Sequence, residues 1–406
     1  MNDFSPGEKE PFCMMKKRWT GIFTGSNLVA YFYGFCIFLL MKPYFMWGYY
    51  EQVNVLIIYV LSFIGIFNLR KAEKLDLLII PIFALLLLSL ASDAHANFMG
   101  YISSLLILFY FVIDRKVMLK YYKCFKTILV ISLFLSLIVY VLVILSYPMG
   151  YSLIDPLNPL KDFLYKQYPF LVMPNEIINV EFPRFYGAFD EPGVVGTFAG
   201  IMLFAERYNL KKISNIILFI SGIFAFSLFF ILLSAVAILY FYRTKLKLVA
   251  IAAVIALYLF TKDNEDVKGL VWERFEMQDG RLKGDNRTSE ELDYYFDLFV
   301  HSDYFLWGTH TDVAADSSSY KQFLIYYGFI FTVLISILLL VISAQINKNV
   351  KGTFLSMLLY LALMYQRPYL FDFAYMFLIV SSFIQVNVSL NYSRYLKKKE
   401  VRLCFN

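Results

Sequence analysis

The sequence predicts an all-α protein, a polytopic bundle of transmembrane helices with two large polar loops on one side of the membrane. Of its 406 residues, 60% are hydrophobic and 17% charged, whereas a soluble domain carries roughly a quarter charged residues. Apolar runs close to the length that crosses about 30 Å of hydrocarbon recur along the chain. Basic residues gather in short clusters beside these runs, which is typical of topology signals.

Each apolar run is expected to be a helix, because backbone polar groups in lipid must be hydrogen-bonded within their own segment. Twelve helices are expected, near residues 21–41, 53–69, 75–91, 98–113, 127–146, 191–206, 213–226, 228–242, 246–261, 319–343, 353–366 and 373–390. Residues 1–406 then form one integral membrane domain. Residues 147–190 and 262–318 are its two large outer loops.

The stretch from Ile213 to Phe241 fits either one long helix or a hairpin of two short ones. With the hairpin, the basic clusters fall on one face, and the short loops of the other face hold only Lys42 and Arg367. A single helix would place the last three clusters outside, against the positive-inside rule. The hairpin is therefore preferred, with both termini cytoplasmic.

The net charge of +6 follows the same topology pattern, so we expect the lipid bilayer as a partner and no nucleic acid.

The first segment with chemical potential runs from Pro183 to Gly193, where an outer loop ends and a helix begins. Glu191 fits either an N-cap or a substrate-binding role, and Pro192 fits the first helical turn. Arg184 lies just before this helix, where the free N–H groups favour an anion. The bound anion is either a substrate diphosphate or a lipid headgroup.

The second segment repeats this arrangement, because Arg287 lies just before a predicted capping box, Thr288 to Glu291. One face of the following helix is apolar, formed by Leu292, Tyr295, Phe296, Phe299 and Val300. Arg184 and Arg287, each beside a helix start, are predicted to bracket one pyrophosphate at the outer membrane surface.

Further candidates are His310, a general acid or base near neutral pH, and Asp316, which fits either an N-cap or a catalytic carboxylate. The three histidines lack the paired spacing of a zinc site, so no metal and no cofactor is expected. Nucleotide-binding and hydrolase motifs are absent from the sequence. Few ionisable residues fall within the predicted spans, which disfavours an ion-coupled transporter.

Together these motifs resemble the bacterial O-antigen polymerase (Wzy) and O-antigen ligase superfamily. The resemblance rests on Arg184 to Gly193, Arg287 with its amphipathic stretch, Leu306-Trp-Gly308, and Asp316-Ser-Ser-Ser-Tyr leading into Leu324 to Ile330. The motifs cover about a fifth of the chain, whereas the many-span architecture covers all of it.

The resemblance implies a GT-C-like glycosyltransferase of the bacterial inner membrane, acting at its periplasmic face in lipopolysaccharide biosynthesis. Its substrate would be an undecaprenyl-diphosphate-linked oligosaccharide, and a polysaccharide chain-length regulator would be a partner. Arg184 and Arg287 would then hold the diphosphate and neutralise the leaving group. Glu191, His310 or Asp316 would orient or deprotonate the attacking hydroxyl.

Two alternatives with an active role stay open, beside a non-catalytic membrane scaffold, which the two arginines placed before helix starts make less attractive. One is an O-antigen ligase-type transferase, although ligases of this superfamily tend to show a His-Asn pair where this chain has Asp316-Ser317. The other is a flippase or transporter of lipid-linked sugars. A flippase should line a central cavity with cationic residues from its spans, and the predicted spans carry few.

Overall fold

The computed structural model describes residues 25–70, 106–107, 109–157, 163–175, 183–242, 290–310 and 319–404, together with isolated positions between 244 and 282. Its elements are α2 (Gly25–Leu40), η1 (Tyr44–Tyr49), α3 (Tyr50–Ile66), α6 (Phe109–Val112), α7 (Arg115–Ile144), β1 (Ser152–Ile154), β2 (Tyr165–Tyr168), β3 (Leu171–Pro174), α8 (Pro192–Ala205), α9 (Ile213–Phe224), α10 (Leu228–Phe241), β4 (Met277–Gln278), β5 (Arg281–Leu282), α13 (Glu290–Val300), η4 (Asp303–Phe305), α14 (Tyr320–Asn347), α15 (Val350–Gln366) and α16 (Phe373–Cys404).

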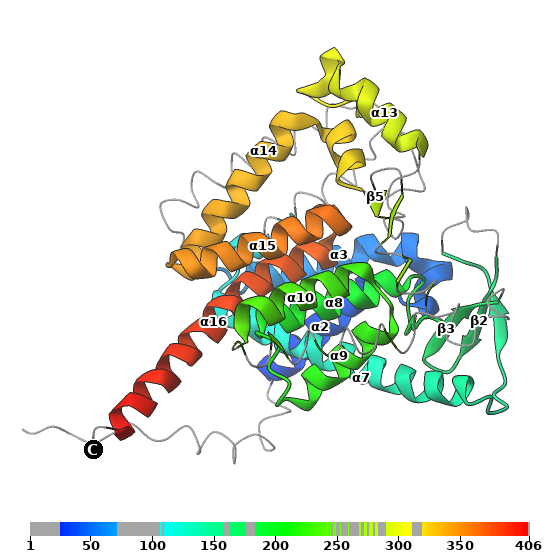
Figure 1. The fold of residues 1–406 in the computed structure, drawn as a ribbon, viewed down its shortest axis with the longest axis horizontal. Helices are drawn as coiled ribbons and strands as arrows, with labels where there is room; N and C mark the ends of the chain where they lie inside the picture. Colours follow the sequence, from blue (N-terminus) through cyan, green and yellow to red (C-terminus); the bar gives the residue numbers. More distant parts are fainter. Residues whose placement is uncertain are drawn as a thin grey trace, which may run out of the picture.

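The protein is a helical membrane protein. Within the described ranges, three helices are long and apolar enough to cross a membrane: Arg115–Ile144, Tyr320–Asn347 and Phe373–Tyr392. Shorter apolar helices pack with them, and Figure 1 shows these helices gathered into one bundle from which α13 projects. The predicted helices near 75–91 and 246–261, and most of the one near 98–113, lie outside the described residues apart from isolated positions.

The stretch from Ile213 to Phe241 forms two helices, as the charge pattern predicts. Helix α9 ends at Phe224 and α10 begins at Leu228. The turn between them passes through Phe226, whose φ of 45° lies in the left-handed region. Two short helices therefore replace one long one.

The centre of the bundle is formed by α8 and α16. Every residue of α8 is buried, and α8 packs against α9, α10 and α16. A helix that is apolar on all sides is expected in such a central position. Gly196 lets α10 approach closely, because a Cβ atom there would lie 2.3 Å from the Cβ of Ser227. The small-residue spacing of Gly196 and Gly200 thus serves helix packing.

The predicted start of the helix near 127 is wrong, because α7 begins at Arg115. Asp114 caps it, since its carboxylate accepts hydrogen bonds from the backbone N–H groups of Lys116 and Val117 at 2.8 and 3.2 Å. The apolar run marks only the part of a helix that lies in lipid. A capped helix can continue beyond the hydrocarbon, and α7 carries its basic cluster on such an extension.

The two large loops that the sequence predicts to be outer contain short strands, which the all-α expectation did not include. Strands β1, β2 and β3 form an antiparallel sheet in chain order, with Leu153 opposite Lys166 and Lys166 opposite Met173. Strands β4 and β5 form a two-stranded hairpin in the second loop. The three-stranded sheet packs Tyr165 against Trp47 and Tyr186, and so supports the start of α8.

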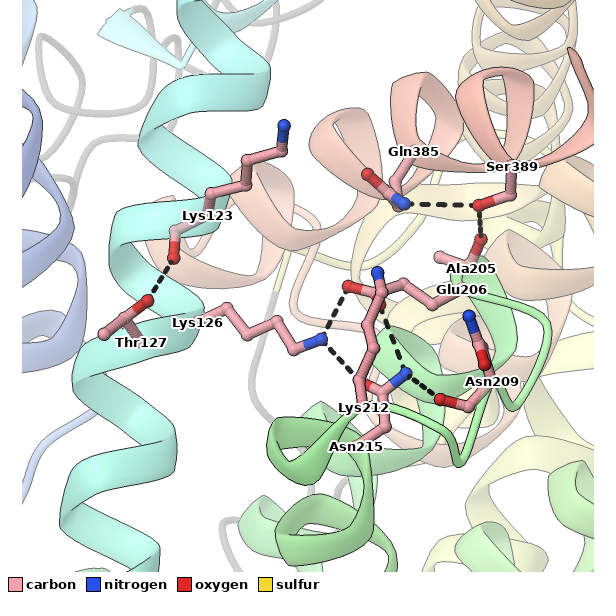
Figure 2. A network of polar contacts seen from close by, with 10 residues as sticks. All are labelled: Lys123, Lys126, Thr127, Ala205, Glu206, Asn209, Lys212, Asn215, Gln385 and Ser389. Carbon is pink, nitrogen blue, oxygen red and sulfur yellow. Dashed lines mark hydrogen bonds and ion pairs between the residues drawn. The ribbon is translucent and has the colours of Figure 1, made fainter. Parts of the chain in front are cut away.

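A buried ionic cluster joins α7 to the turn that follows α8 (Figure 2). Lys126 Nζ lies 2.6 Å from Glu206 Oε1 and 2.5 Å from Asn215 Oδ1, and Lys212 Nζ lies 2.9 Å from Glu206 Oε2. Ser389 of α16 donates a hydrogen bond to the carbonyl of Ala205 beside it. The cluster lies at the end of α8 predicted to be cytoplasmic and fixes it to three helices.

Candidate functional site

A cavity of about 720 Å³ lies among the ends of several helices. Five segments line it: the end of α2, Leu157 in the loop after β1, the start of α8, the first turns of α14, and the loop between α15 and α16. In the predicted topology all five belong to the outer face of the membrane. The cavity therefore lies on the side where the sequence places the large polar loops.

The loop before α8 is held by backbone hydrogen bonds to three neighbouring elements. Phe185 donates to the Phe224 carbonyl at the end of α9, and Gly187 accepts from Val172 of β3. Ala188 accepts a bond of 2.8 Å from the N–H of Tyr44, the first residue of η1. Tyr165 Oη donates to the Asp190 carbonyl at 2.7 Å. Segments distant in the chain thus fix the position of Asp190 and Glu191 at the cavity.

Glu191 occupies the N-cap position of α8, yet its side chain makes no capping hydrogen bond. Its carboxylate instead forms an ion pair with the guanidinium of Arg367, from the loop between α15 and α16. Glu191 is 39% exposed at its side chain and Arg367 only 5%. The capping interpretation of this side chain is therefore wrong, and Glu191 is a cavity residue that faces a buried cation.

Arg367 is a deeply buried cation in the cavity lining, and its Nε atom has no hydrogen-bond partner among the described residues. Burial by itself lowers its pKa, but Tyr375 and the carboxylate of Glu191 outweigh this and raise the pKa above its ordinary value. The guanidinium is therefore charged at every physiological pH. A buried donor without a partner costs free energy unless a ligand satisfies it.

Asp372 contributes a second carboxylate from the same loop. Its Oδ1 atom accepts hydrogen bonds from the backbone N–H groups of Ala374 and Tyr375, at 2.8 and 3.2 Å, and so caps α16. Burial raises the pKa of Asp372, while the charge of Lys42 and the two N–H groups partly oppose the rise. Lys42 also lines the cavity, so both signs of charge are present.

Aromatic rings form one wall of the cavity. Phe323 and Tyr327 of α14 have ring centroids 4.5 Å apart, and Tyr327 lies 5.2 Å from Phe371 of the loop before α16. Tyr326 lies beside them, 4.7 Å from Tyr327. Such rings offer flat apolar faces together with hydroxyl groups, which suits stacking against sugar rings.

This wall is shaped by a break in α14 at Gly328, whose backbone is non-helical with φ of 80°. The turn around Gly308 fits against the break, and a Cβ atom on Gly328 would lie 2.4 Å from the backbone of Trp307. The N–H groups of Thr309 and His310 donate to the carbonyls of Ile325 and Tyr326, at 2.8 and 3.1 Å. The Leu306-Trp-Gly308 motif and the stretch from Leu324 to Ile330 are thus in direct contact.

The structure places the predicted site residues in different environments. Glu191 lines the cavity. His310 does not, but its ring centroid lies 6.0 Å from that of Tyr326, which does. Arg184 is not in the lining, and its guanidinium donates to the carbonyls of Ala225 and Phe226 in the α9–α10 turn, at 3.1 and 3.4 Å. Arg287 and Asp316 lie outside the described residues, so their roles stay predictions.

The site residues predicted from the sequence did not include Lys42, Arg367 or Asp372, which line the cavity. The sequence nevertheless contained an indication of the first two. Lys42 and Arg367 are the two basic residues in the short loops of the predicted outer face, where the positive-inside rule disfavours them. Both line the cavity. A basic residue that opposes the topology pattern is thus a candidate for binding chemistry.

Comparisons with protein-family models, with curated proteins and with solved structures find no significant match to this chain. Its function is therefore argued from the geometry and charge of the cavity.

Proposed function

We propose that the protein is a surface-polysaccharide polymerase of the O-antigen type. It joins undecaprenyl-diphosphate-linked oligosaccharide units at the periplasmic face of the bacterial inner membrane. The observation that carries the proposal is the position of Lys42 and Arg367, the two basic residues of the outer short loops, in the lining of one cavity. Cations in that place match a substrate that presents a diphosphate at the outer membrane surface.

The donor substrate would place its diphosphate between Lys42 and Arg367. A guanidinium and an ammonium can neutralise the charge that develops as the diphosphate leaves, without help from a metal. Because Arg367 is buried and ion-paired with Glu191, its position is set before the substrate binds. Such pre-organised charge stabilises a transition state more effectively than mobile surface charge.

The aromatic wall of Phe323, Tyr326, Tyr327 and Phe371 would hold the sugars. A hydroxyl of one unit attacks the anomeric carbon of the other, the bond from that carbon to the phosphate oxygen breaks, and undecaprenyl diphosphate leaves with the electron pair. Glu191 lines the cavity, and this position supports its assignment to the substrate site. His310 and Asp316 remain candidates by resemblance, and a chain-length regulator remains a proposed partner.

An O-antigen ligase-type transferase would use the same donor and the same cations, and a flippase would move the donor without chemistry. The deciding experiment deletes the gene in its own host and separates the surface glycan on a gel. A collapse of the ladder to core plus one repeat supports polymerisation, because export and ligation still operate. Loss of even the single repeat would exclude the polymerase. Lipid-linked polymer accumulating outside would then indicate a ligase, and its absence a flippase.

A further inference from the structure

Asp372 is held in the cavity lining by a rigid contact with the start of α16. Its Oδ1 atom accepts from the N–H groups of Ala374 and Tyr375, which fixes both torsions of a short side chain. Within the described residues, its second oxygen, Oδ2, accepts no hydrogen bond. One oxygen is therefore anchored and the other is available to a ligand.

Glu191 differs from Asp372 in this respect. Its Oε2 atom is engaged by Arg367, whose buried charge requires a counter-ion. A proton taken up by Glu191 would leave that guanidinium without its partner. Of the two carboxylates, Asp372 is the one whose protonation leaves the ion pair of the cavity intact.

The charged and titratable groups that face Asp372 come from three elements. Lys42 at the end of α2 lowers its pKa, and the phenols of Tyr110 of α6 and Tyr375 of α16 lie close enough to interact with it electrostatically. Arg367 and Glu191 line the same cavity. Lys42 therefore stabilises the ionised carboxylate before the reaction, and it also lies where the diphosphate is proposed to bind.

We propose, resting on the proposed function, that Asp372 is the catalytic base of the transfer. Its Oδ2 accepts the proton of the attacking sugar hydroxyl as the new bond forms between that oxygen and the anomeric carbon. The bond from the anomeric carbon to the diphosphate breaks, and the leaving group takes its electron pair to Lys42 and Arg367. The proton then passes from Asp372 to water. Glu191 acts as a positioning residue that holds Arg367.

Burial supports this assignment, because it raises the pKa of Asp372 above the ordinary carboxyl value. A base works best when its pKa approaches the working pH, since it then binds the transferred proton more strongly while remaining ionised. Perturbed carboxyl groups in clefts are often functional for this reason. Two carboxylates in different environments thus take two different roles.

The test uses the purified full-length protein in lipid vesicles, with the undecaprenyl-diphosphate-linked repeat unit extracted from a host that lacks this gene. Asp372→Asn should keep the cap of α16, because asparagine is also a good N-cap. Its kcat should fall by about 100-fold or more, the range lost with a general base, while donor affinity stays within about twofold. The wild type should show a decline of kcat towards acid pH, and this decline should be absent from the residual activity of Asp372→Asn.

Three further variants make the outcome decisive. Asp372→Ser retains a capping oxygen without a base and should match Asp372→Asn. Glu191→Gln should weaken donor binding and keep the acid decline of kcat. Asp155→Asn, at an exposed aspartate near β1, should behave as the wild type. An Asp372→Asn protein with wild-type kcat, or with the acid decline retained, overturns the base assignment alone. A wild-type protein that elongates nothing overturns the proposed function.

Discussion

Glu191 and Arg367 form an ion pair across 176 residues of sequence, and it joins the start of α8 to the loop between α15 and α16. The other end of α8 is held by a second ionic contact, in which Lys126 and Lys212 bind Glu206. A fully buried helix is thus anchored by a carboxylate at each end. The contact at the start of α8 lies in the cavity, whereas at the other end the side chains of Lys126 and Glu206 are buried.

Replacing Arg367 should abolish glycan elongation without preventing membrane insertion. Arg367→Gln removes a cation proposed to bind the diphosphate, and it breaks the ion pair with Glu191. We expect at least about a 100-fold loss of elongation, the size of effect seen when one transition-state donor is removed. The assay is the surface-glycan ladder of a deletion strain that carries each variant. Lys166→Gln, which removes a positive charge from β2, is the matched control and should leave the ladder unchanged. A normal ladder with Arg367→Gln would contradict the assignment.

A side chain at Gly328 should destabilise the wall of the cavity. Gly328→Ala forces a left-handed backbone on a residue with a Cβ atom and drives that atom to 2.4 Å from the backbone of Trp307. Backbone strain of this kind costs of order 1–3 kcal/mol before the steric overlap is counted. Thermal unfolding in detergent and the glycan ladder should both be impaired. Gly48→Ala meets no atom within 4 Å and should have little effect on either. Equal behaviour of the two variants would argue against the tight fit.

The ionic cluster at Glu206 should make stability fall at acid pH. Although burial raises its pKa, Lys126 and Lys212 outweigh this and hold the pKa below the ordinary value of 4.5. The cluster therefore stabilises the fold fully above that value and loses its contribution as the pH falls through the lower folded-state pKa. In Glu206→Gln this acid-dependent loss should be smaller, and unfolding at neutral pH should be easier by about 3–5 kcal/mol, because two lysines lose their carboxylate. Thermal unfolding between pH 7 and pH 3 measures both. Parallel pH curves for the two proteins would contradict this role.

Asp372→Asn should fold at least as stably as the wild type at neutral pH. The raised pKa of Asp372 means that the ionised carboxyl is less favourable in the folded protein than in the unfolded one. Its unfavourable contribution is present at neutral pH and disappears as the pH falls below both pKa values. Asparagine keeps the cap and removes the charge. A large fall in the unfolding temperature at pH 7 would show that the carboxylate is structural.

The membrane topology can be tested with single cysteines labelled by an impermeant reagent in whole cells, in a protein whose native cysteines are replaced. Positions 48 and 369 are expected to be labelled from outside, because they lie in the segments that follow α2 and α15 on the predicted outer face. Position 349, between α14 and α15, is expected to be protected. Labelling of position 349 in intact cells would show that the topology is the reverse of the predicted one and that the cavity faces the cytoplasm.

Hydrophobicity and charge in the sequence were enough to predict a helical membrane protein and the division of Ile213–Phe241 into two helices. Both depend on local composition, because lipid forces each apolar segment to satisfy its own backbone. Helix ends were less well predicted. Helix α7, for example, begins at Arg115 after a cap at Asp114, well before its apolar part. The strands β1 to β3 were missed because they depend on pairing between segments of an irregular loop.

The sequence alone predicted that a helix begins at Glu191, on the face predicted to be outer, and it marked Lys42 and Arg367 as exceptions to the predicted charge pattern. Only the tertiary structure decided that these three residues and Asp372 line one cavity, and that Arg184 binds a helix turn instead. The reason is physical. Ion pairs and cavities form between side chains that the packing of separate helices brings together, and local sequence carries no record of which helix ends become neighbours.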